Sequence, residues 1–322
     1  MASAAPPLVS VITPVYNGGA YLEECIESVL SQSWRHWEYV IVDNCSSDRT
    51  GEIAEIYAGK DERIRVVHND QLLPIIDNWN LAMRQISLES RYTKVLHGDD
   101  LLFRECIEKM VALAEGHPSV GIVGAYRLDG CTPRPRPGLP HTQTVFSGVA
   151  VAADTLRLRH SVFGSPSTLL IRSNLVRERP DFYDHRYLHA DKASCLELLQ
   201  RCDFGFVPQL LTYTRLHGES QSSTTADRLG TRVLENLLML REFGPSLLPE
   251  DELREHLARH ERRHYRFLAR RLFRPEVQRH HRERLARHGH ELSPWKLAAA
   301  CVTGSLAQLL PPGLAGSRHG AA

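Results

Sequence analysis

The chain lacks the features that mark disulfide-rich, secreted and membrane-spanning proteins. Its seven cysteines are odd in number and form no CxxC pair, which argues against a disulfide framework and a zinc ribbon. No stretch reaches the roughly 18 to 20 apolar residues that a membrane-spanning helix needs. Residues 1–7 lack the basic and apolar regions of a secretory signal. We therefore expect a cytoplasmic protein.

A strong charge of one sign is also missing. The 322 residues carry a formal net charge of +1 and are 42% hydrophobic, which is an ordinary soluble composition rather than that of a disordered chain or a nucleic-acid binder. The length allows one large domain and an appendage. Any basic partner surface must therefore be local.

Strand and helix patterns alternate through the first 126 residues. The predicted strands are 8–13, 39–42, 64–67, 92–96 and 120–126. The predicted helices are 21–30, a second one opening at 48–50, 75–86 and 105–114. This alternation predicts an α/β fold with a mostly parallel central sheet and helices on both faces.

The second half of the chain is less regular. Gly130–Pro140 is rich in proline and is predicted to be an exposed loop. Further strands are predicted at 165–171, 204–207 and 210–213, with a helix at 192–201. From Asp227 onward the pattern is helical, so residues 226–322 are predicted to form a helical, basic C-terminal extension.

Polar residues follow the first two strands, where a doubly wound sheet binds its ligand. The first turn holds Tyr16, Asn17 and two glycines, without the GxGxxG fingerprint that a dinucleotide-binding enzyme would carry. After the second strand, Asp43 and Asn44 could hydrogen-bond a base or a ribose. The alternative is that this second turn only shapes and caps the next helix through Asp48.

The strongest local signal is His97-Gly98-Asp99-Asp100, directly after a buried strand. Adjacent buried acids are costly unless they meet a cation, and oxygen ligands suit Mg²⁺ or Mn²⁺ bound to a nucleotide diphosphate. Such a turn alone is more often a helix cap. Combined with the turns at 14–19 and 43–48, it favours a divalent-metal site.

Four segments resemble, in order, the blocks of the family 2 glycosyltransferases, which have the Rossmann-like GT-A fold. The segments are VSVITPVYN (9–17), VIVDNCSSD (40–48), NWNLAM (78–83) and YTKVLHGDDLL (92–102). The resemblance spans roughly residues 8–220. It implies a catalytic domain over 1–225, in which 8–130 bind the nucleotide sugar and 145–225 face the acceptor.

The resemblance also implies roles for individual residues. Asp99 would be the metal-binding acid of the DxD motif, and His97 replaces the first acid of that motif, although imidazole can also ligate Mn²⁺. The residues implied to contact the nucleotide sugar are Pro14, Tyr16, Asn17, Asp43, Asn44, Asn78 and Asp100.

Two residues of the second half complete the implied site. Asp191 matches the family's acidic position before a late helix and would be the base that deprotonates the acceptor hydroxyl; a helix N-cap is the alternative. His217 lies in a late loop and would complete the metal shell or bind a phosphate oxygen. An unrelated loop histidine is the alternative there.

The stretch 253–290 contains a dozen arginines, few acids and several large apolar residues. A basic amphipathic stretch of this kind predicts contact with an anionic membrane surface, here the inner face of the cytoplasmic membrane. A solvated helix packed on the domain is the alternative. No nucleic-acid partner is expected, because no recognised binding module accompanies the charge.

The sequence therefore predicts transfer of a sugar from a UDP-sugar, with inversion, to a glycan or lipid-linked acceptor, in synthesis of bacterial surface polysaccharide or glycoconjugate. One alternative is a nucleotidyltransferase, but Val15–Gly19 lacks the basic residues expected of its loop. Another is a non-catalytic module whose metal site His97 has disabled.

Overall fold

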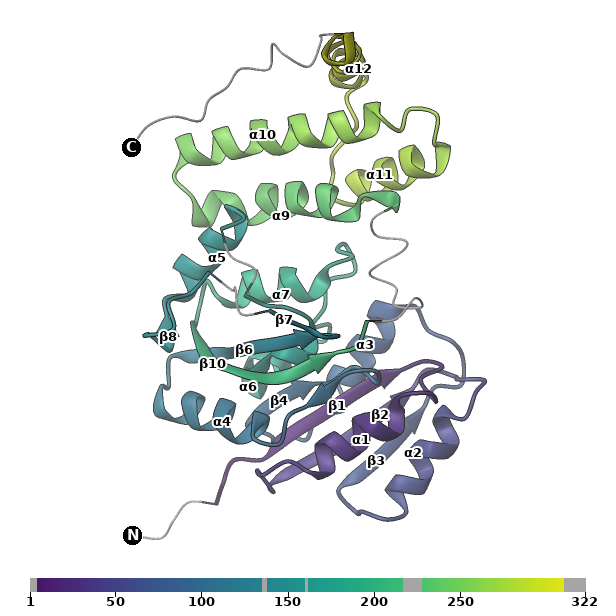
Figure 1. Ribbon diagram of the computed structural model, residues 1–322, viewed down its shortest axis with the longest axis vertical. Coiled ribbons are helices and arrows are strands. Elements are labelled where there is room, and N and C mark those ends of the chain that lie inside the picture. Colours follow the sequence, from purple (N-terminus) through teal and green to yellow (C-terminus); the bar gives the residue numbers. More distant parts are fainter. Residues whose placement is uncertain (1–4, 135–137, 160–161, 217–227, 310–322) are drawn as a thin grey trace. The chain divides into compact units, whose positions relative to one another are not determined.

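The computed structural model describes residues 5–134, 138–159, 162–216 and 228–309 (Figure 1). The chain divides into two compact units, Met1–His217 and Gly218–Ala322. The predicted domain boundary at 225 falls among the residues that the structure does not describe, so it stays a prediction.

The first unit is built on one ten-stranded sheet. Its strands are β1 (Val9–Val15), β2 (Trp37–Asp43), β3 (Ile64–His68), β4 (Tyr92–Val95), β5 (Leu101–Leu102), β6 (Val120–Asp129), β7 (Thr132–Arg134), β8 (Val145–Phe146), β9 (Leu170–Arg172) and β10 (Asp203–Thr214). Its helices are α1 (Leu22–Leu30), α2 (Thr50–Ala58), α3 (Ile75–Met83), α4 (Cys106–Gly116), α5 (Gly148–Leu156), α6 (Ser173–Arg177) and α7 (Ala190–Leu198).

The sheet is mixed but mostly parallel, as predicted. Its order is β3-β2-β1-β4-β9-β6-β10-β5, with β7 beside β6 and β8 beside β10. The strands β3, β2, β1 and β4 are parallel neighbours, and so are β6 and β10. Strand β9 runs antiparallel between β4 and β6. The four parallel strands therefore end at one edge of the sheet.

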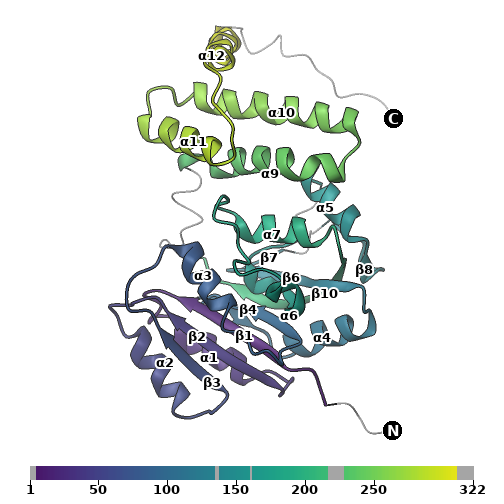
Figure 2. The ribbon, with the colours of Figure 1, turned by 180° about the vertical axis from the view of Figure 1, so that it is seen from behind.

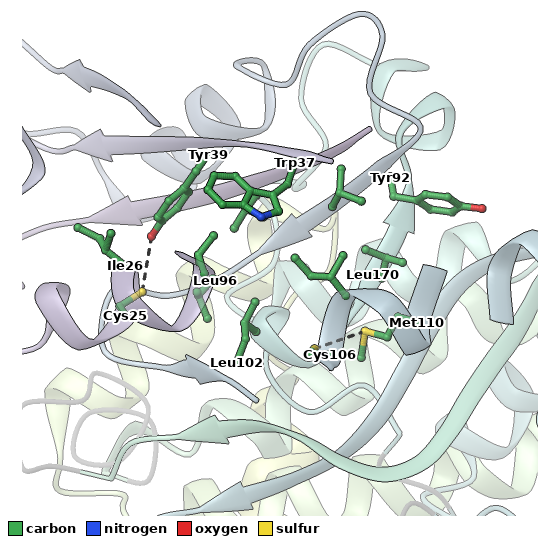
Figure 3. Close-up of a cluster of buried hydrophobic side chains, with 14 of the residues drawn as sticks. Cys25, Ile26, Trp37, Tyr39, Tyr92, Leu96, Leu102, Cys106, Met110 and Leu170 are labelled. Atoms are coloured by element: carbon green, nitrogen blue, oxygen red, sulfur yellow. Dashed lines mark hydrogen bonds between the residues drawn. The ribbon is translucent and has the colours of Figure 1, made fainter. Parts of the chain in front are cut away.

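Helices cover both faces of this sheet (Figures 1 and 2). Helix α1 packs on the sheet because its apolar residues recur at helical spacing and form one buried face. These residues are Leu22, Cys25, Ile26 and Val29. They join one apolar cluster with residues of α2, α4 and the facing side of the strands, including Trp37 and Tyr39 (Figure 3). Helices α3 and α6 contact the sheet outside this cluster.

Three local predictions were wrong. The predicted strand 165–171 begins as a 3₁₀ turn, Pro166–Thr168, because the proline fixes a turn there, and β9 starts only at Leu170. The two predicted strands 204–207 and 210–213 are the single strand β10, whose register shifts between Val207 and Leu210. Part of the predicted loop Gly130–Pro140 is β7, which pairs with β6.

The described part of the second unit is helical. It contains α9 (Thr231–Leu247), α10 (Glu250–Ala269), α11 (Pro275–Arg287) and α12 (Pro294–Leu309). Helix α10 packs against both α9 and α12. Among the described residues of the chain, none of the helices has the length and apolar content required to cross a bilayer.

Candidate functional site

The site lies at the carboxyl edge of the four parallel strands. Tyr16 and Asn17 follow β1, Asn44 follows β2, Asn69 follows β3, and the His97 turn comes directly after β4 and Leu96. The backbone N–H of Asn44 donates to the Val15 carbonyl at 2.8 Å, so the first two turns continue the ladder of the strands. The parallel topology thus gathers the polar turns expected from the sequence.

The turn after β1 is held by the turn after β2. Asn17 has a left-handed backbone, with φ of 50°. Its backbone N–H donates to Ser46 Oγ at 2.9 Å, and its side-chain Oδ1 accepts from the Ser47 N–H at 2.9 Å. Pro14 lies within β1, opposite Val42. Tyr16 is 48% exposed, which leaves its ring available to a base.

Asp48 also connects the same two turns. Its carboxylate accepts from the Gly19 N–H at 2.9 Å and from the Thr50 N–H at 3.0 Å. Partial burial raises the pKa of Asp48, but the hydrogen bonds from Thr50 and Gly19 outweigh it, so the net pKa is lowered. A methyl group on Gly19 would come within 2.8 Å of Asp48 Oδ2, which explains the glycine.

Asp43 is 5% exposed and held on both oxygens. Oδ1 accepts from the Ser46 N–H at 3.1 Å, and Oδ2 lies 3.1 Å from His68 Nδ1. His68 Nε2 in turn lies 2.8 Å from Glu55. The hydrogen bond to Glu55 raises the pKa of His68 despite partial burial, and Asp43 adds to this effect. Because a carboxylate has about four lone-pair directions, Asp43 can still accept from a ligand.

Asn44 and Asn78 are buried and linked to each other. The Asn44 amide pairs with the backbone of Leu73 in both directions, at 2.9 and 3.0 Å. Asn69 Nδ2 bridges Asn44 Oδ1 at 2.8 Å and Asn78 Oδ1 at 3.0 Å. This network shapes the loop 69–74, so the Asn44 side chain is already occupied by protein groups.

The candidate metal group is His97, Asp99 and Asp100. One ligand atom of each lies within 4.8 Å of the others. Two buried atoms of this group, His97 Nε2 and Asp100 Oδ2, have no hydrogen-bond partner. Burial, with a smaller effect of the Asp99 charge, raises the pKa of Asp100, and a cation beside it would favour the ionised form. Unsatisfied nitrogen and oxygen atoms at one point fit a divalent cation.

Neighbouring residues hold this group in place. The Ser167 hydroxyl accepts from the His97 N–H at 3.0 Å, and the buried Lys94 ammonium donates to the Ser167 carbonyl at 2.6 Å. On the other side, the Arg215 N–H donates to Asp100 Oδ1 at 3.2 Å and its Nε donates to the Asp99 carbonyl at 3.1 Å. Both ends of the turn are therefore anchored.

Asp191 is the second residue of α7, whose N-cap is His189, so it does not have the capping position. Its carboxylate has no hydrogen-bond or ion-pair partner among the described residues. Burial, with a contribution from the Asp191 charge, raises the pKa of Tyr183. Tyr183 contacts Trp79, with ring centroids 5.3 Å apart, and Trp79 contacts His97 at 5.1 Å. The two ring contacts link Tyr183 to the metal group, and the Asp191 charge acts on Tyr183.

His217, the remaining predicted site residue, lies outside the described residues. Sequence reasoning missed His68 and the two-turn role of Asp48. His68 ends β3 at the same edge as Asp43, so a search for polar residues at the end of the third strand would have found it. Trp79, beside Asn78, was also missed.

The sequence is similar to those of bacterial glycosyltransferases. A model of the family "Glycosyl transferase family 2" matches residues 10–178. The "Uncharacterized glycosyltransferase EpsJ" of Bacillus subtilis is 52% identical over 120 residues, covering 37% of this chain and 33% of that protein. The "Putative teichuronic acid biosynthesis glycosyltransferase TuaG" of the same organism is 42% identical over 105 residues, covering 33% and 41%. This chain thus spans less than half the length of both relatives.

Solved structures support the fold over a larger part of the chain. S. aureus TarS 1-349 in complex with UDP-GlcNAc has a TM-score of 0.63 at 19% identity, covering 87% of this chain and 80% of that one. The mannosyltransferase PcManGT from Pyrobaculum calidifontis, in complex with GDP-Man and Mn²⁺, has a TM-score of 0.56 at 16% identity, covering 96% and 82%. With the family match over residues 10–178, the sheet topology and the polar turns at its carboxyl edge, this chain belongs to the family 2 glycosyltransferases.

Proposed function

We propose that this protein transfers a sugar from a UDP-sugar to an acceptor hydroxyl with inversion at the anomeric carbon. The observation that carries the proposal is the group His97, Asp99 and Asp100, with two unsatisfied buried atoms at the edge where the polar turns converge. The structurally similar TarS 1-349 is in complex with UDP-GlcNAc, and the structurally similar PcManGT is in complex with GDP-Man and Mn²⁺.

The nucleoside would lie over the turns after β1 and β2. The exposed Tyr16 ring would stack on the base, and Asp43 would accept a hydrogen bond from an N–H of the base or from a ribose hydroxyl. Asn17 and Asn44 would act through the shape of these turns, since their side-chain oxygens already accept from protein N–H groups. Pro14 would fix the strand end below them, and Asn78 would help to hold the loop beside the diphosphate.

A divalent cation, Mn²⁺ or Mg²⁺, would be held by Asp99, Asp100 and His97, and would neutralise charge on the departing diphosphate. His217 is proposed as a further ligand or phosphate contact. Asp191 would take the proton from the acceptor hydroxyl as its oxygen bonds to the anomeric carbon and the bond from that carbon to the diphosphate breaks. Attack opposite the leaving group inverts the anomeric carbon.

In this proposal, residues 8–130 bind the donor, residues 145–225 face the acceptor, and residues 226–322 form an extension outside the catalytic domain. The acceptor is proposed to be a glycan or a lipid-linked glycan of a bacterial surface polysaccharide. The similarity to TuaG, a "Putative teichuronic acid biosynthesis glycosyltransferase", supports this choice of acceptor.

The test is release of nucleoside diphosphate from a panel of UDP-, GDP- and dTDP-sugars, with and without Mn²⁺. We expect metal-dependent release from a UDP-sugar. Asp99→Asn and Asp191→Asn should each lower turnover by at least about a hundredfold, and Asp191→Asn should still bind UDP in calorimetry. The exposed acid Asp251 in α10 offers a matched control, Asp251→Asn, which should keep normal turnover.

Near-normal turnover of either site variant would remove that residue from its proposed role. If no sugar nucleotide of the panel released nucleoside diphosphate and none bound to the protein, a non-catalytic module would be favoured instead. Release from a GDP- or dTDP-sugar alone would keep the reaction class and correct the donor.

A further inference from the structure

The second unit carries a concentration of unbalanced positive charge. Eight arginines of α10, α11 and their connection are exposed, and their guanidinium groups have no ion-pair or hydrogen-bond partner among the described residues. They are Arg262, Arg263, Arg266, Arg270, Arg274, Arg279, Arg282 and Arg287. At the start of α10, by contrast, Arg254 and Arg259 pair with Glu250 and Glu255. The charge is therefore left uncompensated over one part of the unit.

Large apolar side chains are exposed to solvent within this basic region. Phe273 is 93% exposed and Leu272 is 42% exposed, in the short connection between α10 and α11. Both lie in sequence between the exposed Arg270 and Arg274. Adjacent exposed apolar side chains of this kind form a patch, and exposed apolar patches rimmed by polar residues mark interaction sites.

Helix α12 turns an apolar face outward. Trp295 is 85% and Val302 is 61% exposed, and the exposed Ala298 and Ala299 lie between them at helical spacing. The opposite side of the helix carries the buried Ala300. The start of α12 is tied to α10, because Lys296 pairs with Glu261 at 2.6 Å and the Ser293 N–H donates to the Tyr265 hydroxyl at 2.9 Å.

We propose that the C-terminal unit binds the surface of an anionic phospholipid bilayer without crossing it. The unpaired arginines would contact lipid headgroups, and Phe273, Trp295 and the outward face of α12 would enter the interfacial layer. A nucleic acid would also match the arginines, but it would leave the apolar face of α12 in water. The lipid surface accounts for both features. The inference rests on the second unit alone and does not depend on the proposed catalysis.

The test is co-flotation of the full chain with vesicles. One set is phosphatidylcholine alone, and the other contains about 30 mol% phosphatidylglycerol, the kind of anionic surface that attracts basic segments. We expect at least about tenfold stronger partition onto the anionic vesicles, weakened by salt. Equal partition onto both vesicle sets, or onto neither, would overturn the proposal.

Two groups of variants separate the charge from the apolar contacts. Phe273→Ser with Trp295→Ser should lower partition onto the anionic vesicles by about tenfold. Glutamine at Arg262, Arg263, Arg266 and Arg270 should abolish the preference for anionic lipid. The matched controls are Arg254→Gln with Arg259→Gln on the same helix, and Leu88→Ser, an 85% exposed apolar residue of the first unit. Both controls should partition like the unchanged protein.

Folding and partner identity are checked on the same samples. Each variant should keep the melting temperature of the unchanged protein, and a variant that does not is replaced by the single substitution Phe273→Ser. If labelled single-stranded RNA bound at the same salt concentration while the anionic vesicles did not, the surface would belong to a nucleic-acid site and the proposal would be wrong.

Discussion

By the family resemblance, His97 would stand where the DxD motif has its first acid, and its surroundings suit an imidazole ligand. The Trp79 ring lies beside the imidazole, with its centroid 5.1 Å from that of His97. The backbone of His97 is held by Ser167, while Nε2 is buried without a partner. A buried imidazole nitrogen without a hydrogen-bond partner is a suitable ligand for Mn²⁺.

We therefore expect His97→Ala to raise the Mn²⁺ concentration needed for half-maximal turnover by on the order of tenfold, because one ligand is lost. His97→Asp supplies a third carboxylate and should require no more Mn²⁺ than the unchanged protein. Titration of Mn²⁺ against release of nucleoside diphosphate measures both. The exposed His117 provides the control His117→Ala; an unchanged Mn²⁺ requirement in His97→Ala would mean that the imidazole is not a ligand.

Single residues of the site were only partly predictable. Residue type and position after a strand were enough to select Asp43, Asp99 and Asp100 as candidates. They did not reveal that the Asn44 side chain is hydrogen-bonded to the backbone of Leu73. That contact depends on the conformation of a segment 29 residues away. The partner of Asp43, His68, ends the third strand at the same edge, so its position could have been found from the sequence, although its contact with Asp43 could not.

At the scale of elements, alternating patterns predicted the parallel strands and their helices because each element buries one apolar face. Prediction failed where the backbone departs from regularity. Pro208 and Gln209 lie at the register shift that made β10 look like two strands, because a proline interrupts the ladder without ending the strand. Helix α5 was not predicted at all.

The coupling of the turn after β1 to the start of α2 gives a prediction at this scale. Asp48→Ala removes the acceptor shared by Gly19 and Thr50, so the first unit should lose about 1–2 kcal/mol of unfolding free energy. UDP should also bind more weakly, since the turn carrying Tyr16 is released. Denaturant unfolding and calorimetry measure the two effects.

Asp48→Asn is the matched variant, because its amide oxygen can still accept one of the two N–H groups. The pKa of Asp48 is lowered in the folded protein, so its ionised form contributes stability above its ordinary pKa of 3.8, and the contribution is lost as the pH falls below that value. If Asp48→Ala and Asp48→Asn were equally stable at neutral pH, the two turns would not depend on this acceptor.

The whole molecule consists of two units with different chemistry. The residue pattern predicted a helical C-terminal part, and its dense arginine and histidine set it apart from the alternating first part. What composition did not show is that some of these histidines are buried: His264 and His281 are 1% and 0% exposed. Burial of a particular histidine depends on how helices pack, which a one-dimensional pattern of charges does not encode.

The buried histidines join two helices of the second unit through neutral rings. His264 Nε2 lies 2.9 Å from His281 Nδ1, and His281 Nε2 lies 2.7 Å from the Leu229 carbonyl. The carbonyl can only accept, so His281 donates from Nε2, and its Nδ1 accepts from His264. Burial, reinforced by neighbouring positive charge, lowers the pKa of His264 to about 3 and that of His281 to about 4.

The second unit should therefore lose stability as the pH falls from about 6.5 toward 4. In that range the two histidines bind protons in the unfolded chain but stay neutral in the folded unit. The loss should reach about 1.4 kcal/mol per pH unit for each histidine. Calorimetric melts of the full chain between pH 8 and pH 5 measure it, and the variant His281→Gln keeps a donor and an acceptor without titrating. That variant should show a shallower decline, because the proton uptake of His281 is removed; an identical decline in both proteins would place the acid sensitivity elsewhere.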